Sequence, residues 1–225
     1  MFVRARRRFL DLLASIYIYN EHRGYTSIDR VLEAVRLRHP DATDFIAAVE
    51  KHRRDERKHY VMFKRYFELL GRMPFAVDRG CGHIDRLIKL TFNCTIEELD
   101  TDEVAGSEEL FQKLCRIIVL TEERGLRQIG ILLRSPLVRA DKPLVKIFQI
   151  IGKDEPDHFM PYQAWIERRG SGKRRLRERV ADFWVHRVLV LYKVPLLYLD
   201  PRLARRSEWP DAHEAEGRFK AATAS

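Results

Sequence analysis

Cysteine is scarce in this sequence. The chain of 225 residues contains three cysteines, Cys81, Cys94 and Cys115, and no Cys-x-x-Cys pair. An odd number without paired spacing argues against a disulfide framework and against a cysteine-rich structural zinc site. This usage fits a reducing compartment, so we expect a cytoplasmic protein, with peripheral attachment to the inner membrane face as a variant of that expectation.

Long uncharged apolar runs are also missing. No stretch reaches the roughly 20 residues that a membrane-spanning helix needs. The basic residues 1–8 and the apolar residues 9–19 imitate a secretory signal, but Asp11 interrupts the apolar run and no small-residue cleavage site follows. We therefore expect this segment to form the first helix of the mature fold.

Glycine and proline are few, at 11 and 9 residues, and alternating strand patterns are rare. Helical periodicity dominates instead, which predicts an all-α chain. The breaks between periodic segments predict long helices over about residues 3–22, 43–70, 107–135 and 141–168. A glycine-containing break at 24–27 and a short helix to about residue 39 follow the first of these. The long connection 71–106 holds one more short helix around 83–92.

Three segments follow from these breaks. Residues 1–169 are expected to form a four-helix bundle, and 170–200 a basic and apolar helical extension. Residues 201–225 read as a polar, flexible tail.

Acidic charge is in deficit, since 42 Lys and Arg against 33 Asp and Glu give a net charge of +9. This surplus predicts attraction to an anionic partner. In residues 173–199, basic residues precede an apolar run, which suits a helix lying on an anionic membrane surface. The alternative is a helix that covers the bundle with its charges in solvent. Nucleic acid is a third, less favoured partner, because no recognition motif accompanies the charge.

The motif Glu-x-x-His occurs twice, as Glu56 with His59 and as Glu155 with His158. Positions i and i+3 share a helix face, so each pair can bind one metal ion. An aspartate precedes each glutamate, at Asp55 and Asp154. We expect these aspartates to lie in the second shell and accept hydrogen bonds from metal-bound imidazoles.

Each motif follows a helix that carries a further carboxylate. Glu21 lies 35 residues before Glu56, and Glu122 lies 33 residues before Glu155, separations that suit antiparallel helices. Glu122 continues the apolar seam of its helix, whereas Glu123 turns away. Buried carboxylates require cationic partners, and the four charges of this set would be neutralised by two divalent ions.

One glutamate from each of two helices, with Glu-x-x-His from the other two, resembles the ferritin-like di-iron carboxylate proteins. The doubled Asp-Glu-x-x-His resembles the bacterial multicomponent monooxygenases and related O2-activating enzymes more than the iron-storage ferritins. The resemblance covers roughly residues 3–168. It implies a ferritin-like antiparallel four-helix bundle with one long crossover and an extra C-terminal helix. It also implies two iron ions, with manganese or a mixed Mn/Fe pair as alternatives. The ligands implied are Glu21, Glu56, His59, Glu122, Glu155 and His158.

The function expected from this resemblance is O2 activation that oxidises or hydroxylates an organic substrate. A lipid, a quinone or a modified transfer RNA are the substrate classes considered, as in quinone hydroxylases and transfer-RNA hydroxylases of the superfamily. Ferroxidase, iron-handling or peroxide-scavenging activity is the first alternative. A non-enzymatic ferritin-like scaffold that binds a partner or a membrane is the second. A homodimer remains open.

Two positions complicate the predicted site. Pro156 lies inside the second motif and cannot donate to the carbonyl of Gly152, so we expect the fourth helix to be kinked or bulged there. His52 lies one turn before Glu56 on the same seam. We interpret it as a second-shell or pocket residue rather than as a direct ligand.

Overall fold

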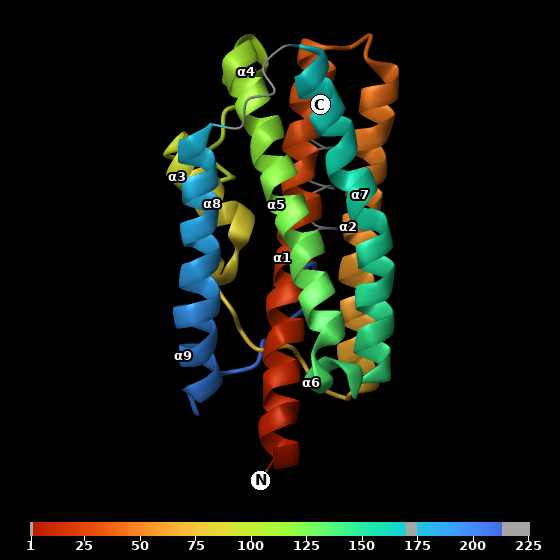
Figure 1. The fold of residues 1–225 in the computed structure, drawn as a ribbon, viewed down its shortest axis with the longest axis vertical. Coiled ribbons are helices and arrows are strands. Elements are labelled where there is room, and N and C mark those ends of the chain that lie inside the picture. The colour runs from red at the N-terminus through yellow and green to blue at the C-terminus, as the bar shows by residue number, and fades with distance from the viewer. Residues whose placement is uncertain (1, 170–174, 213–225) are drawn as a thin grey trace.

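The computed structural model describes residues 2–169 and 175–212. Four long helices stand side by side as a bundle (Figure 1). These are α1 (Phe2–Arg38), α2 (Thr43–Leu69), α5 (Glu108–Arg134) and α7 (Lys142–Arg168). Helix α1 packs on α2, α5 packs on α7, and α2 joins the two pairs through α7. The described residues contain one isolated antiparallel bridge and no longer β pairing, so the all-α prediction is confirmed.

Helix α1 is continuous, and the predicted break at residues 24–27 is wrong. Thr26 and Ser27 donate their hydroxyl hydrogens to the carbonyls of His22 and Gly24, at 2.8 and 2.9 Å, so they bond back to the helix rather than end it. Tyr25 is buried in the apolar core. Tertiary packing therefore outweighs the low helix propensity of glycine.

A glycine ends α2, and side-chain caps begin α5 and α7. Gly71 follows α2 with a φ of +62°, and Ser107 accepts a hydrogen bond from the Leu110 amide at the start of α5. Asp141 caps α7 in the same way, after the single turn of α6 (Pro136–Arg139). The predicted helix around residues 83–92 is present as α3 (His83–Phe92). Two short elements complete the connection, η1 (Arg79–Cys81) and α4 (Thr101–Gly106).

Helix α7 remains α-helical through Pro156 and Pro161, so the bulge expected at Pro156 is absent. Gly152, whose carbonyl loses its usual donor, packs against α5. A Cβ atom at this position would lie 3.2 Å from Cγ2 of Ile129. The bulge of the chain lies elsewhere, in the π-helical turn η2 (Leu189–Lys193) just before Pro195, which cannot donate a backbone hydrogen bond.

The expected C-terminal helix is present as α8 (Leu176–Val188), η2 and α9 (Val194–Leu199). It runs along the α3 and α5 side of the bundle (Figure 1). Buried ion pairs attach α8 to α5, with Arg116 to Glu178 at 2.8 Å and Arg124 to Asp182 at 3.1 Å. The start of the predicted extension, residues 170–174, lies outside the described residues. None of the described helices has the apolar length to cross a bilayer.

Residues 201–212, expected to belong to a loose tail, pack back on the bundle. Arg205 forms a 2.7 Å ion pair with the buried Asp11 and a β-bridge with Phe75. Lys64 binds Asp211 at 3.0 Å. The rest of the tail, 213–225, lies outside the described residues.

The described residues form three apolar core clusters, and each long helix passes from one to another of the two largest. On α1 the change falls between Tyr25 and Ile28, and on α2 between Val49 and Tyr60. The corresponding changes on α5 and α7 fall in the same layer of the bundle. The glutamates and histidines of the predicted site occupy that layer, so these two clusters enclose it from both ends.

Candidate metal centre

All four long helices contribute to one buried polar layer. Glu21, Glu56 and Glu155 are between 6% and 7% exposed, and His59 and His158 are fully buried. The side chain of Glu122 is 20% exposed. The structure therefore brings the six predicted ligands into one layer from four different helices.

The first cluster contains Glu21, Glu56 and His59. Nδ1 of His59 lies 3.3 Å from Oε2 of Glu21 and 3.9 Å from Oε1 of Glu56. One nitrogen or oxygen atom from each residue lies within 4.8 Å of the others, a spacing that one ion could occupy. This cluster offers two carboxylates and one imidazole.

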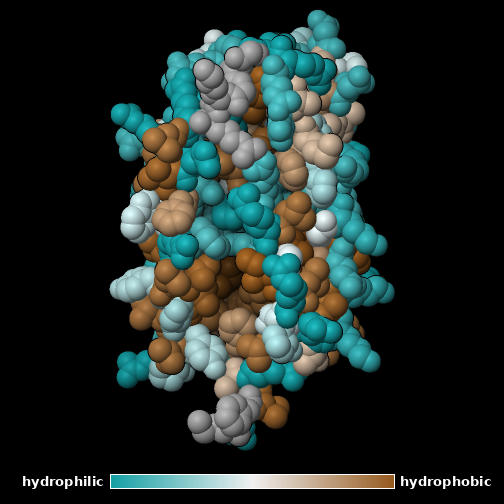
Figure 2. Space-filling view, in the orientation of Figure 1, coloured by the Kyte–Doolittle hydropathy of each residue, from teal (hydrophilic) through white to brown (hydrophobic). Residues whose placement is uncertain are grey.

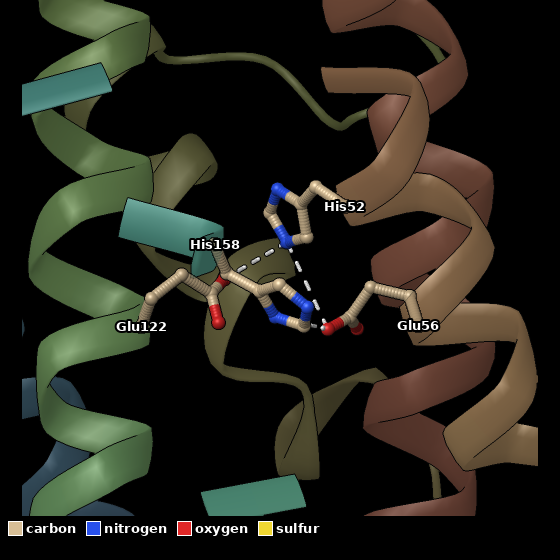
Figure 3. A group of neighbouring side chains, drawn as sticks. All are labelled: His52, Glu56, Glu122 and His158. Atoms are coloured by element: carbon tan, nitrogen blue, oxygen red, sulfur yellow. Dashed lines mark ion pairs between the residues drawn. The ribbon is translucent and has the colours of Figure 1, made fainter. Parts of the chain in front are cut away.

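The second cluster contains His52, Glu56, Glu122 and His158 (Figure 3). Oε1 of Glu56 lies 3.3 Å from Nδ1 of His158 and 3.7 Å from Nε2 of His52. Nε2 of His52 is also 3.9 Å from Oε1 of Glu122. Glu56 belongs to both clusters and would therefore bridge two ions. His52, interpreted from the sequence as a pocket residue, is a seventh candidate ligand.

The other two glutamates of α5 and α7 are placed differently. Glu123, the neighbour of Glu122, faces Arg127 at 3.9 Å. Glu155 lies beside the second cluster, with Oε1 close to Gly125, and its buried Oε2 has no hydrogen-bond partner among the described residues. Glu155 thus offers a carboxylate oxygen at the edge of the centre.

The aspartates of the two motifs cross between helices. Asp154 of α7 accepts from Nε2 of His59 on α2 at 2.9 Å, and Asp55 of α2 lies 3.5 Å from Nε2 of His158 on α7. Lys58 binds both aspartates, at 2.7 and 2.8 Å. Each aspartate thus orients the histidine of the other motif and leaves its Nδ1 directed at the clusters.

Burial without a cation disfavours the charged form of these carboxyl groups. It raises the pKa of Glu21 to about 8, with the negative charge of Glu122 as the next cause. It raises the pKa of Glu122 to about 7, with Glu56 as the next cause. The pKa values of Glu56 and Glu155 are raised for the same reason.

The pKa values of the two motif histidines shift in opposite directions. Burial lowers the pKa of His59, which stays neutral and suited to bind a metal. Burial alone would also lower the pKa of His158, but the neighbouring carboxylates of Asp55 and Glu56, at 3.5 and 3.3 Å, raise it to about 10. In the metal-free chain the imidazolium of His158 therefore provides positive charge among the glutamates, a role that a bound cation would take over.

Two glycines make room for the motif glutamates, and sequence reasoning missed both. A Cβ atom at Gly24 would lie 2.0 Å from Oε2 of Glu56, and one at Gly125 would lie 3.3 Å from Oε1 of Glu155. Each glycine ends a Glu-x-Arg-Gly run, at residues 21–24 and 122–125. This repeated run, one turn after each first-helix glutamate, was the sequence signal available.

The residues present fit a pair of divalent ions. Buried ring nitrogens of His52, His59 and His158, and Oε2 of Glu155, lack a hydrogen-bond partner among the described residues. Leaving such atoms unpaired costs about 1–3 kcal/mol each, so their convergence calls for a ligand. Mixed imidazole and carboxylate donors suit iron, manganese or zinc rather than magnesium or calcium.

A cavity of about 370 Å³ opens directly onto this layer. Glu21, Glu56, Glu122 and Glu155 line one side of it, and most of the remaining lining is apolar. Ile131 and Val190 line it too and are 61% and 43% exposed, so they mark its mouth. Figure 2 shows the hollow on this face, surrounded by hydrophobic residues in the lower half of the view. Its volume is in the range of small-molecule sites.

Comparisons with known proteins give no relative from which a function could be transferred: no family model, no curated protein and no solved structure matches the chain.

Proposed function

We propose that this protein binds two iron ions in the glutamate and histidine layer and uses O2 to oxidise an organic substrate held in the adjoining cavity. The observation that carries the proposal is the junction of the two metal-ligand clusters with a largely apolar cavity. A closed structural metal site would not need such an opening. The resemblance of the paired motifs to ferritin-like di-iron proteins supports iron in particular.

The roles of the chain's own residues follow from the geometry. Glu56 would bridge the two ions, since its Oε1 lies within 4 Å of three imidazoles. Asp55 and Asp154 hold the imidazole rings in the orientation that presents Nδ1. When bound, the ions supply the one-electron chemistry that O2 reduction needs. The apolar cavity wall excludes water from the reacting groups.

The cavity favours oxidation of an organic molecule over iron handling. A ferroxidase or storage protein needs a polar path for hydrated iron, whereas the mouth of this cavity is formed by Ile131 and Val190. The test therefore has to distinguish oxidation of an organic substrate from iron handling.

The test is O2 consumption by the full chain loaded anaerobically with ferrous iron. We expect one rapid uptake of O2 by the bound iron, followed by sustained uptake only with a reductant and an extract of apolar metabolites. Glu56→Ala serves as the metal-deficient control. Uptake that stops once the bound iron is oxidised, with every extract, would favour iron handling and contradict the oxidase.

We also propose that the outer face of α8, η2 and α9 binds an anionic membrane surface. Phe183, Trp184 and Leu191 are 51%, 60% and 65% exposed, and the exposed arginines Arg175 and Arg177 lie at the start of this segment. Apolar side chains next to basic ones suit the boundary of a bilayer with acidic headgroups.

The membrane proposal is tested by sedimentation with phosphatidylglycerol vesicles. We expect binding at low salt that weakens at high salt and is lost in Trp184→Ser/Leu191→Ser. Leu69→Ser removes another highly exposed leucine, 83% exposed on α2, and is the matched control. Equal sedimentation of wild type and the double variant would contradict this surface.

A further inference from the structure

A second group of polar side chains lines the cavity away from the metal-ligand clusters. It comprises His83 of α3, Arg124 and Gln128 of α5, and His186 of α8. The rings of His83 and His186 stack, with centroids 5.9 Å apart and an angle of 25° between their planes. Four polar residues from three helices in one part of an apolar cavity need an explanation, because burying polar groups costs free energy unless they have partners.

The hydrogen bonds within this group leave donors directed at the cavity. Gln128 Nε2 lies 2.7 Å from Nδ1 of His186 and donates to it, which places the ring hydrogen of the neutral imidazole on Nε2. Arg124 donates through Nε to Asp182, and its two terminal nitrogens have no acceptor among the described residues. Nε2 of His83 is buried and also unpartnered.

The charge around the group selects the kind of ligand. Arg124 and Asp182 neutralise each other, and burial lowers the pKa of both histidines, with nearby arginines as the next cause. Neutral imidazoles and an arginine offer N–H donors, while the one carboxylate present already has a partner. Such a set binds an oxygen acceptor and does not bind a cation.

The polar group lies next to the metal centre along α5. Arg124 and Gln128 follow Glu122 by two and six residues on α5, about 3 and 9 Å along the helix axis. Beyond Gln128 the cavity wall is apolar, with Ile131 and Leu132 of α5, Leu13 of α1 and Val194 of α9. The cavity thus has a donor-rich part near the glutamates and an apolar part toward its mouth.

We infer that this cavity takes an amphiphile, a molecule with an apolar body and a single oxygen-bearing head group, and that His83, Arg124 and His186 bind that head group. The inference rests on the proposed function in one respect, that the ligand is the substrate of the metal centre. The binding site itself does not depend on any oxidation step.

The test is calorimetric titration of the metal-loaded full chain with three probes that share an apolar chain. Decanoate and 2-undecanone carry oxygen acceptors, and decyltrimethylammonium carries none. We expect the two oxygenated probes to bind at least about tenfold more tightly than the ammonium probe, the effect of one or two hydrogen bonds. Equal affinity for all three probes, or no binding of any, would overturn the inference.

Two matched variants locate the site. His83→Phe keeps a stacked aromatic ring but removes Nε2, and we expect about tenfold weaker binding of decanoate and 2-undecanone with an unchanged melting temperature. His39→Phe is the control, because His39 is likewise half-buried and its Nε2 makes no hydrogen bond within the described residues. That atom lies 3.8 Å from a carboxylate oxygen of Glu108, and the ring packs on Phe111 and Trp165. Equal affinities in the two variants would place the head group elsewhere. Since the readout is binding, loss of the oxidase proposal would leave this result standing.

Discussion

The α1–α2 pair and the α5–α7 pair each carry a Glu-x-Arg-Gly run on the first helix and an Asp-Glu-x-x-His run on the second. They differ just outside these runs. Four residues before the motif glutamate, α2 has His52 and α7 has Ile151. Four residues after the motif histidine, α2 has Phe63 and α7 has Tyr162. His52 Nδ1 and the Tyr162 hydroxyl lie 3.2 Å apart, whereas Ile151 and Phe63 belong to one apolar cluster.

This difference makes the two halves of the centre chemically unequal. The cluster on the α1 side has one imidazole, from His59, and the cluster on the α5 side has two, from His52 and His158. The repeated motif therefore builds the centre, and the residues flanking it distinguish its two metal positions. Replacing equivalent residues in the two halves tests whether they contribute equally to metal binding.

The largest expected effect is a difference in the amount of bound metal between Glu56→Ala and Glu155→Ala. Both clusters found among the described residues contain Glu56, and neither contains Glu155. We expect Glu56→Ala to lose most of the bound metal and Glu155→Ala to keep roughly one of the two ions. Elemental analysis of each variant after anaerobic loading and desalting measures this. Equal losses in the two variants would break the assignment of Glu56 as the bridging residue.

The next largest effect should be a loss of metal affinity when Asp55 or Asp154, each bonded to the histidine of the other motif, is replaced. Asp55→Asn and Asp154→Asn each remove the charge that orients a histidine of the other motif, so we expect metal affinity to fall about 10–100-fold in both. Asp157→Asn is the control, because Asp157 is 61% exposed and forms its ion pair with Lys51 rather than with a histidine of the centre. Competition with a metallochromic chelator gives the affinities. If Asp157→Asn lowered metal affinity as much as the other two variants, the effect would be one of surface charge and not of histidine orientation.

Replacing Gly24 or Gly125 by alanine should affect stability and metal binding differently. Gly24→Ala and Gly125→Ala should each stabilise the helix by about 0.5–1 kcal/mol before any steric cost. The added Cβ would displace the Glu56 carboxylate in the first variant, at 2.0 Å, and would shift Glu155 by only a few tenths of an ångström in the second, at 3.3 Å. We therefore expect metal loss in Gly24→Ala only. Unchanged metal content in Gly24→Ala would contradict the clearance role.

The smallest effect concerns pH. The metal-free chain holds Glu21 and Glu122 with pKa values of about 8 and 7, above their ordinary value of 4.5. Their stabilising contribution is full below 4.5 and is lost as pH rises through these values, because only the folded state retains the protons. The lowered pKa values of His52 and His59 act in the opposite direction only below about 6.5, and the raised pKa of His158 adds to the fall above that pH. We thus expect the melting temperature to fall between pH 6.5 and 8.5.

The control for the pH effect is Glu21→Gln/Glu122→Gln, which should flatten this slope. Bound metal should flatten it too, since cations keep the carboxylates charged. A melting temperature that rises over the same interval in the metal-free wild type would have the wrong sign for buried, protonated carboxyl groups.

Much of the fold was predictable from the sequence, because caps and periodicity act locally. Ser107 and Asp141 mark helix starts, and the apolar seams point to the layer in which the ligands meet. Gly24 misled the prediction, since its conformational freedom suggested a break. Its structural role is the space it leaves for Glu56, which depends on a neighbouring helix.

Features that depend on the register between helices were not predictable. The exchange of Asp55 and Asp154 between motifs requires α2 and α7 to lie antiparallel with their motifs level, which no local pattern specifies. The direction of the His52 side chain also depends on the register between helices, since its ring points to Glu122 of a different helix. The donor group at His83 and His186 likewise forms only when α3 and α8 close over the cavity.

The iron content of the full-length protein shows whether this bundle holds two metal ions. The chain is loaded anaerobically with ferrous iron, desalted and analysed by Mössbauer spectroscopy together with elemental analysis. We expect about two irons per chain in two unequal environments, because one cluster has a single imidazole and the other has two. A folded chain that retains no iron would contradict this expectation.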